Sequence, residues 1–248
     1  MGTGRRHHPS QPARGLAVRV LVTGGDGLLG TELKKHLDAI YTDKADLDVL
    51  SLPQVFEAML EHRPNVVLHL AAWTDVAGAE THRQEAWDLN VVSPQHLARA
   101  AKFTGAKVVY LSSDYVFDGQ AGGYQPWDAP NPLNYYGLTK MAGECMVRSI
   151  PASLIIRTSF KPARFPHPKA VEDLWTCADY VDVIAPMIVD ILGYTGIHHL
   201  GTEPKTVLDL VRQRTPDVGG MRREDIKSVR LPRDVTFGDC HHWDWESC

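Results

Sequence analysis

Residues 20 to 30 read Val-Leu-Val-Thr-Gly-Gly-Asp-Gly-Leu-Leu-Gly. The run from Val18 to Val22 is short, apolar and rich in β-branched side chains, which predicts a buried strand. From Leu28 to Leu37 the apolar residues recur at helical spacing. Gly24, Gly27 and Gly30 therefore lie at a strand-to-helix turn. Glycines there let the backbone approach a pyrophosphate, and the helix N-terminus offers free N–H groups to phosphates. This stretch predicts a dinucleotide-binding turn.

Strand and helix patterns alternate beyond this turn. Strands are expected at 39–42, 66–70, 107–111 and 153–156, and helices at 52–62, 85–103 and 134–147. Nearly continuous apolar strands indicate burial on both faces, so we expect an α/β fold: a Rossmann-type, doubly wound parallel sheet.

The pattern loosens after residue 158. A loop is expected at 162–168, helices at 180–192 and 206–212, a strand at 196–200, and an irregular tail from 230. We predict a disordered leader at 1–16 and an NAD(P)-binding domain at 17–159. Residues 160–248 are expected to form a small substrate-binding lobe, interleaved with the main domain.

Composition narrows the function classes. The chain has 248 residues and a net charge of -4, so it has no overall attraction to nucleic acid or to an anionic membrane. Residues 1–16 lack the apolar core of a signal peptide, and no run is long and apolar enough to span a bilayer. The four scattered cysteines do not indicate a disulfide framework, so the cytoplasm is the expected compartment. Cys240-His-His242 with Cys248 matches no standard zinc spacing, and we expect no metal site.

Two charged residues follow the second predicted strand, Asp43 and Lys44. An acid at this place holds the adenosine ribose hydroxyls, whereas a base favours the extra phosphate of NADP. Because both are present, the choice between NAD and NADP stays open.

A candidate proton-transfer set lies further along the chain. Tyr136 and Lys140 are four residues apart at the start of a predicted helix, so they share one face. Tyrosine normally titrates at about pH 10, and we expect the nearby ammonium to lower that pKa. Ser113 follows a predicted strand at its carboxyl end, where ligands gather in open α/β sheets, and its hydroxyl suits a substrate carbonyl. The neighbouring Tyr135 lacks the four-residue step to Lys140.

With these features, the sequence resembles the dTDP-4-dehydrorhamnose reductase family of extended short-chain dehydrogenase/reductases. The resemblance is colinear from about Val18 to Ser159. The matching motifs are Thr23-Gly-Gly-Asp-Gly-Leu-Leu-Gly30, Asp46-Leu-Asp48, Arg63-Pro-Asn-Val-Val67, Ala71-Ala-Trp-Thr74, Ala79-Glu80, Asn90, Ser112-Ser-Asp-Tyr-Val-Phe-Asp-Gly119, Pro130-Asn-Pro-Leu-Asn-Tyr-Tyr-Gly137, Lys140, Ala142-Gly-Glu144 and Arg157-Thr-Ser159.

The resemblance implies that Ser113, Tyr136 and Lys140 are catalytic. It also implies reduction of a 4-keto group on a nucleotide-linked 6-deoxysugar, with NADP or NAD as cofactor. A nucleotide sugar is the expected substrate, and a second copy or a partner enzyme is a candidate protein partner. The implied cofactor-binding residues are Gly24, Gly27, Leu28, Leu29, Gly30, Asp43, Lys44, Asp48, Val49, Ala71, Ala72, Thr74, Asn90, Tyr136 and Lys140.

The sequence also departs from the family. The segment Val76-Ala-Gly-Ala-Glu80 lacks the usual aspartate, and residues 160–168 replace a longer aromatic-rich route. The substrate-binding part therefore looks trimmed. This suits an alternative, a catalytically weak or inactive NAD(P)-binding regulatory subunit, because the β subunit of methionine adenosyltransferase resembles the same family. A nucleotide-sugar epimerase or dehydratase is a third alternative, although no glutamate follows Asp114 as dehydratases usually require.

Overall fold

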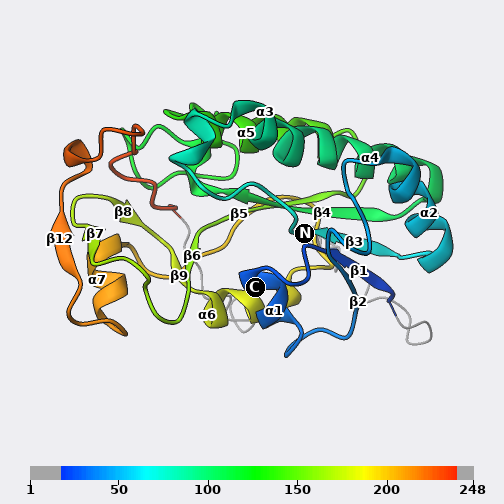
Figure 1. Ribbon diagram of the computed structural model, residues 1–248, viewed down its shortest axis with the longest axis horizontal. Helices are drawn as coiled ribbons and strands as arrows, with labels where there is room; N and C mark the ends of the chain where they lie inside the picture. Colours follow the sequence, from blue (N-terminus) through cyan, green and yellow to red (C-terminus); the bar gives the residue numbers. More distant parts are fainter. Residues whose placement is uncertain (1–17, 239–248) are drawn as a thin grey trace, which may run out of the picture.

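The computed structural model describes residues 18 to 238, so the predicted leader and the Cys240–Cys248 motif lie outside it. Its centre is a six-stranded sheet in the order β10-β5-β4-β3-β1-β2, and every neighbouring pair is parallel (Figure 1). The predicted Rossmann-type α/β class is confirmed. The strands are β1 (Val20–Thr23), β2 (Ile40–Thr42), β3 (Val66–His69), β4 (Lys107–Ser113), β5 (Leu154–Thr158) and β10 (Gly196–His199).

Helices cover both faces of this sheet, which explains its apolar strands. One layer lies above the sheet in Figure 1 and a second layer lies below it. The upper helices are α2 (Leu52–His62), α3 (Arg83–Trp87), α4 (Ser93–Thr104) and α5 (Tyr135–Val147), and the lower ones are α1 (Leu28–Leu33) and α6 (Val181–Asp190). Each layer buries its own apolar cluster against the sheet, and the sheet lies between the two clusters.

The helix expected at 85–103 is interrupted. It starts at Arg83, widens into a π-helical turn at Asp88–Val92 and continues as α4. Pro94 has no N–H to donate to the Asn90 carbonyl oxygen, which would be its partner in a regular helix. That oxygen accepts instead from the Tyr110 hydroxyl at 3.1 Å.

The strand order reverses direction at β1. The chain leaves β1 to form β2 on one side and returns to form β3 on the other. In such sheets a crevice opens beyond the carboxyl ends of the strands at this switch point. Gly24 lies there with a φ of +71°, and a Cβ on it would be 2.7 Å from the Ala71 backbone nitrogen. Glycine is therefore required where the two loops meet.

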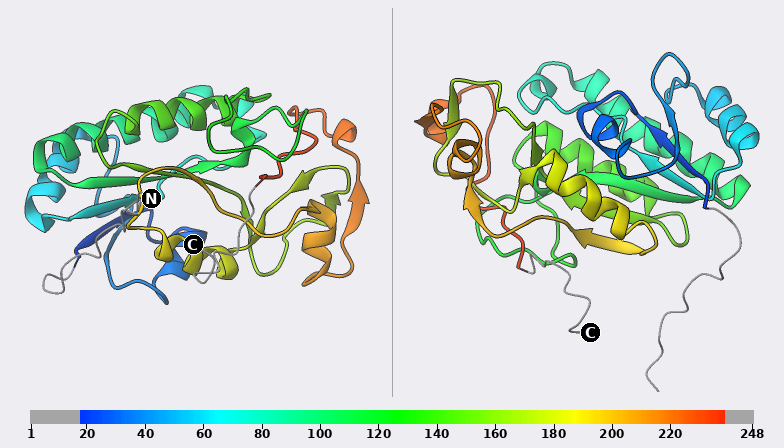
Figure 2. Two further views of the ribbon diagram at one scale, coloured as in Figure 1. Left: turned by 180° about the vertical axis from the view of Figure 1, so that it is seen from behind. Right: turned by 90° about the horizontal axis from the view of Figure 1, so that it is seen from below.

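Residues after β5 build a small lobe from paired short strands. The pairs are β6 (Phe160–Lys161) with β9 (Asp179–Tyr180), β7 (Lys169–Val171) with β12 (Gly219–Met221), and β8 (Trp175–Thr176) with β11 (Lys205–Thr206), followed by α7 (Val207–Arg212). These elements lie beyond one end of the main sheet (Figure 2). Between them, α6 and β10 return to the main sheet, so the two parts are interleaved.

One cysteine forms a disulfide that the sequence spacing did not indicate. Cys177, which is 1% exposed in the core of the lobe, is disulfide-bonded. Sequence spacing does not show which cysteines come close in space, and a disulfide depends on that distance. Within residues 18–238, every helix is too short or too polar to cross a membrane.

Candidate active site

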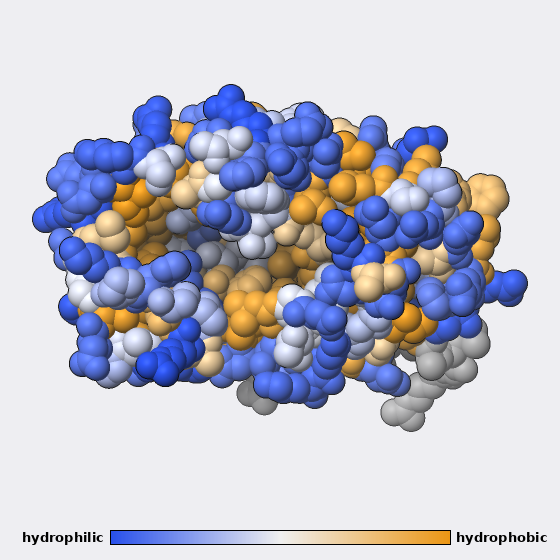
Figure 3. All heavy atoms as spheres, in the orientation of Figure 1, coloured by the Kyte–Doolittle hydropathy of each residue, from blue (hydrophilic) through white to orange (hydrophobic). Residues whose placement is uncertain are grey.

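A cleft of about 1130 Å³ opens at the carboxyl ends of the central strands. Figure 3 shows the recess on the face that carries it. Its size is sufficient for a large organic ligand. All but one of the predicted site residues line it. These are Gly24, Gly27, Leu28, Leu29, Gly30, Asp43, Lys44, Asp48, Val49, Ala71, Ala72, Thr74, Ser113, Tyr136 and Lys140.

The exception is Asn90, which is fully buried and does not line the cleft. Its Oδ1 accepts from the Trp73 backbone N–H at 2.9 Å, and its Nδ2 donates to the Trp73 carbonyl at 3.1 Å. Nδ2 also donates to the Thr139 hydroxyl at 2.9 Å. In the structure, Asn90 therefore fixes the loop after β3 against α5, and Trp73 lines the cleft from that loop.

The glycines of the first turn have different surroundings. A Cβ at Gly30 would lie 2.6 Å from the carbonyl oxygens of both Gly24 and Gly25, so this position has no room for a side chain. A Cβ at Gly27 would meet only the Gly24 oxygen, at 3.2 Å. Because Gly27 also lines the cleft, a larger side chain there would project into the space that a ligand fills.

Asp43 and Lys44, which follow β2, lie beside this glycine turn. One carboxylate oxygen of Asp43 accepts from the Asp26 backbone N–H at 3.1 Å, and the other from the Lys44 N–H at 2.6 Å. Asp43 is thereby held against the glycine turn. Lys44 is exposed on the cleft rim, where its side chain is free to meet a charged ligand group.

Ser113 ends β4 on the opposite side of the cleft. Its hydroxyl accepts from the Tyr115 N–H at 3.1 Å and donates to Asp114 Oδ1 at 3.1 Å. The second oxygen of Asp114 accepts from the Thr176 hydroxyl at 3.0 Å. Burial raises the pKa of Asp114 to about 6, against the opposing effects of Lys161 and these hydroxyls.

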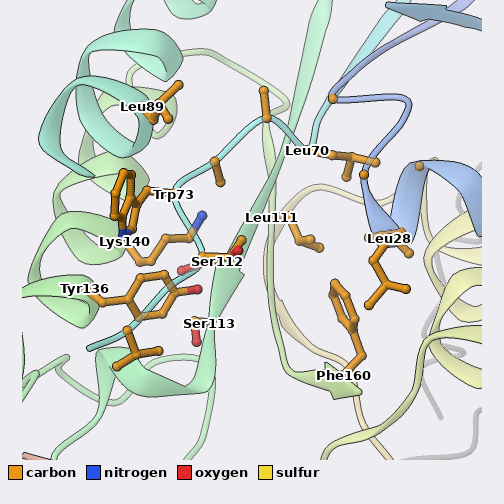
Figure 4. Close-up of a pocket in the computed structure, with 18 of the residues that line it drawn as sticks. Leu28, Leu70, Trp73, Leu89, Leu111, Ser112, Ser113, Tyr136, Lys140 and Phe160 are labelled. Carbon is orange, nitrogen blue, oxygen red and sulfur yellow. The ribbon is translucent and has the colours of Figure 1, made fainter. Parts of the chain in front are cut away.

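Tyr136 lies on α5 with its hydroxyl directed towards Ser112 and Ser113 (Figure 4). Burial raises its pKa to about 12, and a hydrogen bond with Ser113 acts in the opposite direction. This corrects the expectation that Lys140 lowers the pKa of Tyr136. In the structure the loss of water around the phenol and the charge of Asp114 both raise this pKa, so Tyr136 is a protonated donor at neutral pH.

Lys140 projects into the cleft one turn after Tyr136. Only 3% of the residue is exposed, and its Nζ lies 4.5 Å from the centre of the Tyr110 ring. Burial lowers its pKa to about 7, while the Glu144 carboxylate acts to raise it. The ammonium is therefore close to losing its proton at neutral pH.

A buried ion pair positions the helix that carries Tyr136 and Lys140. Arg157 on β5 donates to Glu144 on α5 from Nε at 2.9 Å and from Nη2 at 2.8 Å. Ser112 on β4 donates to the same carboxylate at 2.6 Å. These contacts hold α5 over the ends of β4 and β5.

The structure adds residues that sequence reasoning did not assign to the site. Thr158, Ser159, Phe160 and Lys161 line the cleft opposite the α5 wall. The available signal was their position after a predicted strand. Because β5 pairs with β4 in a register that places Thr158 beside Ser113, the segment reaches the same sheet edge.

Residues 18–161 match the model of the RmlD substrate binding domain. The chain belongs to this family. It is 35% identical over 157 residues to a dTDP-4-dehydrorhamnose reductase of Mycobacterium tuberculosis, which covers 59% of the chain and 51% of the relative. The corresponding Streptomyces griseus reductase is 41% identical over 150 residues, with 57% and 49% covered. The chain thus spans about half the length of the curated relatives that it matches.

A different kind of protein also belongs among the relatives. The methionine adenosyltransferase 2 subunit β of Bos taurus is 38% identical over 138 residues, covering 51% of this chain and 41% of that one. Among solved structures, a Bacillus anthracis dTDP-4-dehydrorhamnose reductase in complex with NADP superposes with a TM-score of 0.81 at 27% identity. That superposition covers 91% of both chains, so it extends beyond residue 161 into the small lobe.

Proposed function

We propose that this chain is an NAD(P)H-dependent reductase of a 4-keto-6-deoxy sugar linked to a nucleotide, like dTDP-4-dehydrorhamnose reductase. The main support is that Ser113, Tyr136 and Lys140 line the same cleft as the glycine turn. We further propose that residues 17–159 hold the cofactor and that residues 160–248 supply the sugar side.

The residues of the cleft fit a nicotinamide dinucleotide. The backbone at Gly27 is open to the cleft, Asp43 suits the ribose hydroxyls, and Lys44 suits a 2′-phosphate. The adenine side would lie by Asp48 and Val49, and Ala71, Ala72 and Thr74 would flank the pyrophosphate and ribose. When bound, NAD(P)H supplies the hydride. The NADP in the Bacillus anthracis relative supports a nicotinamide dinucleotide as the ligand of this cleft.

The chain's own residues would handle the proton and the carbonyl. The Tyr136 phenol, protonated because of its raised pKa, donates its proton to the forming alkoxide. The Ser113 hydroxyl must turn from Asp114 to the substrate carbonyl, which can only accept a hydrogen bond. Lys140 holds the nicotinamide ribose and the phenolate that remains after transfer.

One experiment tests this function directly. Purified protein is mixed with NADPH or NADH and a dTDP-4-keto-6-deoxysugar, and the absorbance of the reduced nicotinamide is followed. We expect a loss of absorbance that depends on the sugar. No loss with either cofactor, in protein that binds both, would count against the reductase.

The bovine relative favours a second candidate, an NAD(P)-binding regulatory subunit with little or no turnover. In that case the chain would bind a methionine adenosyltransferase catalytic subunit and change its kinetics. Tyr136→Phe separates the candidates, because it removes the proton donor of a reductase and leaves a docking surface unchanged.

A further inference from the structure

Besides Lys44 on the rim, two lysines line the cleft. Lys140 comes from α5 and belongs to the proposed proton-transfer set. Lys161 comes from β6, directly after Phe160, which Figure 4 shows across the cleft from Lys140. Within residues 18–238, no hydrogen-bond acceptor and no carboxylate lies within bonding distance of the Lys161 ammonium, and the proposed mechanism does not use it.

Two lysines outside the cleft, Lys107 and Lys205, have close partners. The ammonium of Lys107 donates to the carbonyl oxygens of Leu192, at 2.7 Å, and of Tyr194. Lys205, which is 8% exposed, lies 3.5 Å from Asp179 and is also hydrogen-bonded to Thr202. Removing an ammonium from water without such partners is unfavourable. Lys161 is half-buried and has no such partner, so an anionic ligand in the cleft would stabilise its charge.

Asp114, whose charge acts on Lys161, does not fill this role. Both oxygens of Asp114 already accept hydrogen bonds, from Ser113 and Thr176. Burial lowers the pKa of Lys161, and the Asp114 charge acts at longer range to raise it. Asp114 therefore favours the ammonium form of Lys161 without occupying its N–H groups.

A second polar residue that lines the cleft comes from the same stretch of chain. Thr158 is 3% exposed and lines the cleft, but its hydroxyl has no hydrogen-bond partner. Buried hydroxyls are normally paired, so an unpaired one on a residue that lines a cleft points to a contact that a ligand would complete. Thr158 and Lys161 are three residues apart, separated by Ser159 and Phe160, which also line the cleft.

We propose that Lys161 and Thr158 form an anion-binding subsite in the substrate half of the cleft. An ammonium and a hydroxyl together donate to anionic oxygens. In nucleotide sugars these oxygens have two sources: the diphosphate, which every nucleotide diphosphate sugar carries, and a sugar carboxylate, which a uronic acid carries and a 6-deoxysugar lacks. The inference rests on the proposed function for the class of ligand, but it requires only binding, not turnover.

Calorimetry with stable nucleotides tests the subsite. Wild type, Lys161→Met and Lys169→Met are titrated with dTDP, dTDP-glucose and dTDP-glucuronic acid. Lys169 is an exposed lysine of β7 outside the cleft and serves as the matched control. If the diphosphate is the source, Lys161→Met weakens dTDP binding roughly ten- to hundredfold, the usual effect of one charged hydrogen bond. If the carboxylate is the source, dTDP affinity is kept and the preference for dTDP-glucuronic acid over dTDP-glucose disappears.

NADPH affinity and thermal unfolding are measured alongside, to separate lost contacts from a deformed cleft. If Lys161→Met lowers both the NADPH affinity and the unfolding temperature, Lys161→Gln and Thr158→Val are tested instead. Each of these variants must weaken nucleotide binding while its NADPH affinity stays unchanged. Equal affinities in wild type and all variants overturn the subsite, and so does a wild type that binds none of the three nucleotides. A wild type that binds dTDP through Lys161 but reduces no sugar would contradict the reductase and leave the subsite standing.

Discussion

Arg157 holds the Glu144 carboxylate through two hydrogen bonds of 2.9 and 2.8 Å, and their side chains are only 1% and 3% exposed. This pair joins β5 to the helix that carries Tyr136 and Lys140. Breaking a buried pair leaves an uncompensated charge, so Arg157→Met should lower the free energy of unfolding by about 3–5 kcal/mol. Urea unfolding measures this.

The exposed pair of Arg222 and Glu172 is the control, because Arg222→Met should cost at most about 1 kcal/mol. Similar losses in both variants would refute the role of the buried pair.

Replacing Tyr136 with Phe keeps the ring and removes the proton donor. If the chain is a reductase, the turnover rate should fall by roughly two to four powers of ten, with NADPH affinity little changed. Steady-state kinetics and calorimetry measure the two effects. Tyr135→Phe is the control, since Tyr135 does not line the cleft. An equal loss in both variants would mean that the Tyr136 oxygen has no special role.

Lys140 should make stability depend on pH. Its pKa of about 7 in the folded state lies below the ordinary lysine value of 10.5. Between these values the unfolded chain binds the extra proton, so the free energy of unfolding rises with pH, by at most about 1.4 kcal/mol per unit. Below pH 7 Lys140 is charged in both states, so the full cost of burying its ammonium remains. Lys140→Met should remove this slope, and urea unfolding at several pH values tests it. The prediction fails if the difference between wild type and variant stays constant from pH 7 to 10. The same variant should lose both turnover and cofactor affinity.

Lys44 should affect cofactor choice. Because a base at this place favours the 2′-phosphate, Lys44→Ala should weaken NADPH binding more than NADH binding. Calorimetry with both cofactors measures the ratio. Lys35→Ala is the control, because Lys35 pairs with Glu32 and does not line the cleft. Equal losses for the two cofactors in Lys44→Ala would show that Lys44 does not meet the phosphate.

Gly27 and Gly30 should respond differently to substitution. Gly27→Val should keep the fold and abolish NADPH binding, because its side chain enters the cleft. Gly30→Val should destabilise the protein, because its Cβ would lie 2.6 Å from two backbone oxygens. Circular dichroism and NADPH titration distinguish these outcomes. Tight NADPH binding by Gly27→Val would contradict the proposed place of the cofactor.

The sequence alone was sufficient for the architecture of the central sheet and for most of the cleft. Apolar strands that alternate with helices leave few alternatives to a parallel sheet, and in such a sheet every strand ends at the same edge. The glycine turn, Ser113, Tyr136 and Lys140 were therefore expected to converge from their positions at strand and helix ends, and all of them line the cleft.

Only the tertiary structure decided the surroundings of these groups. Asn90 turned inward to Trp73, and the pKa of Tyr136 rose instead of falling, because both outcomes depend on burial by segments distant in sequence. For Lys161 the sequence signal was only its position shortly after a predicted strand. Its unpartnered ammonium in the cleft, within electrostatic reach of Asp114, depends on the path of β6 along the cleft. Electrostatic effects depend on distance and burial, which the order of residues does not give.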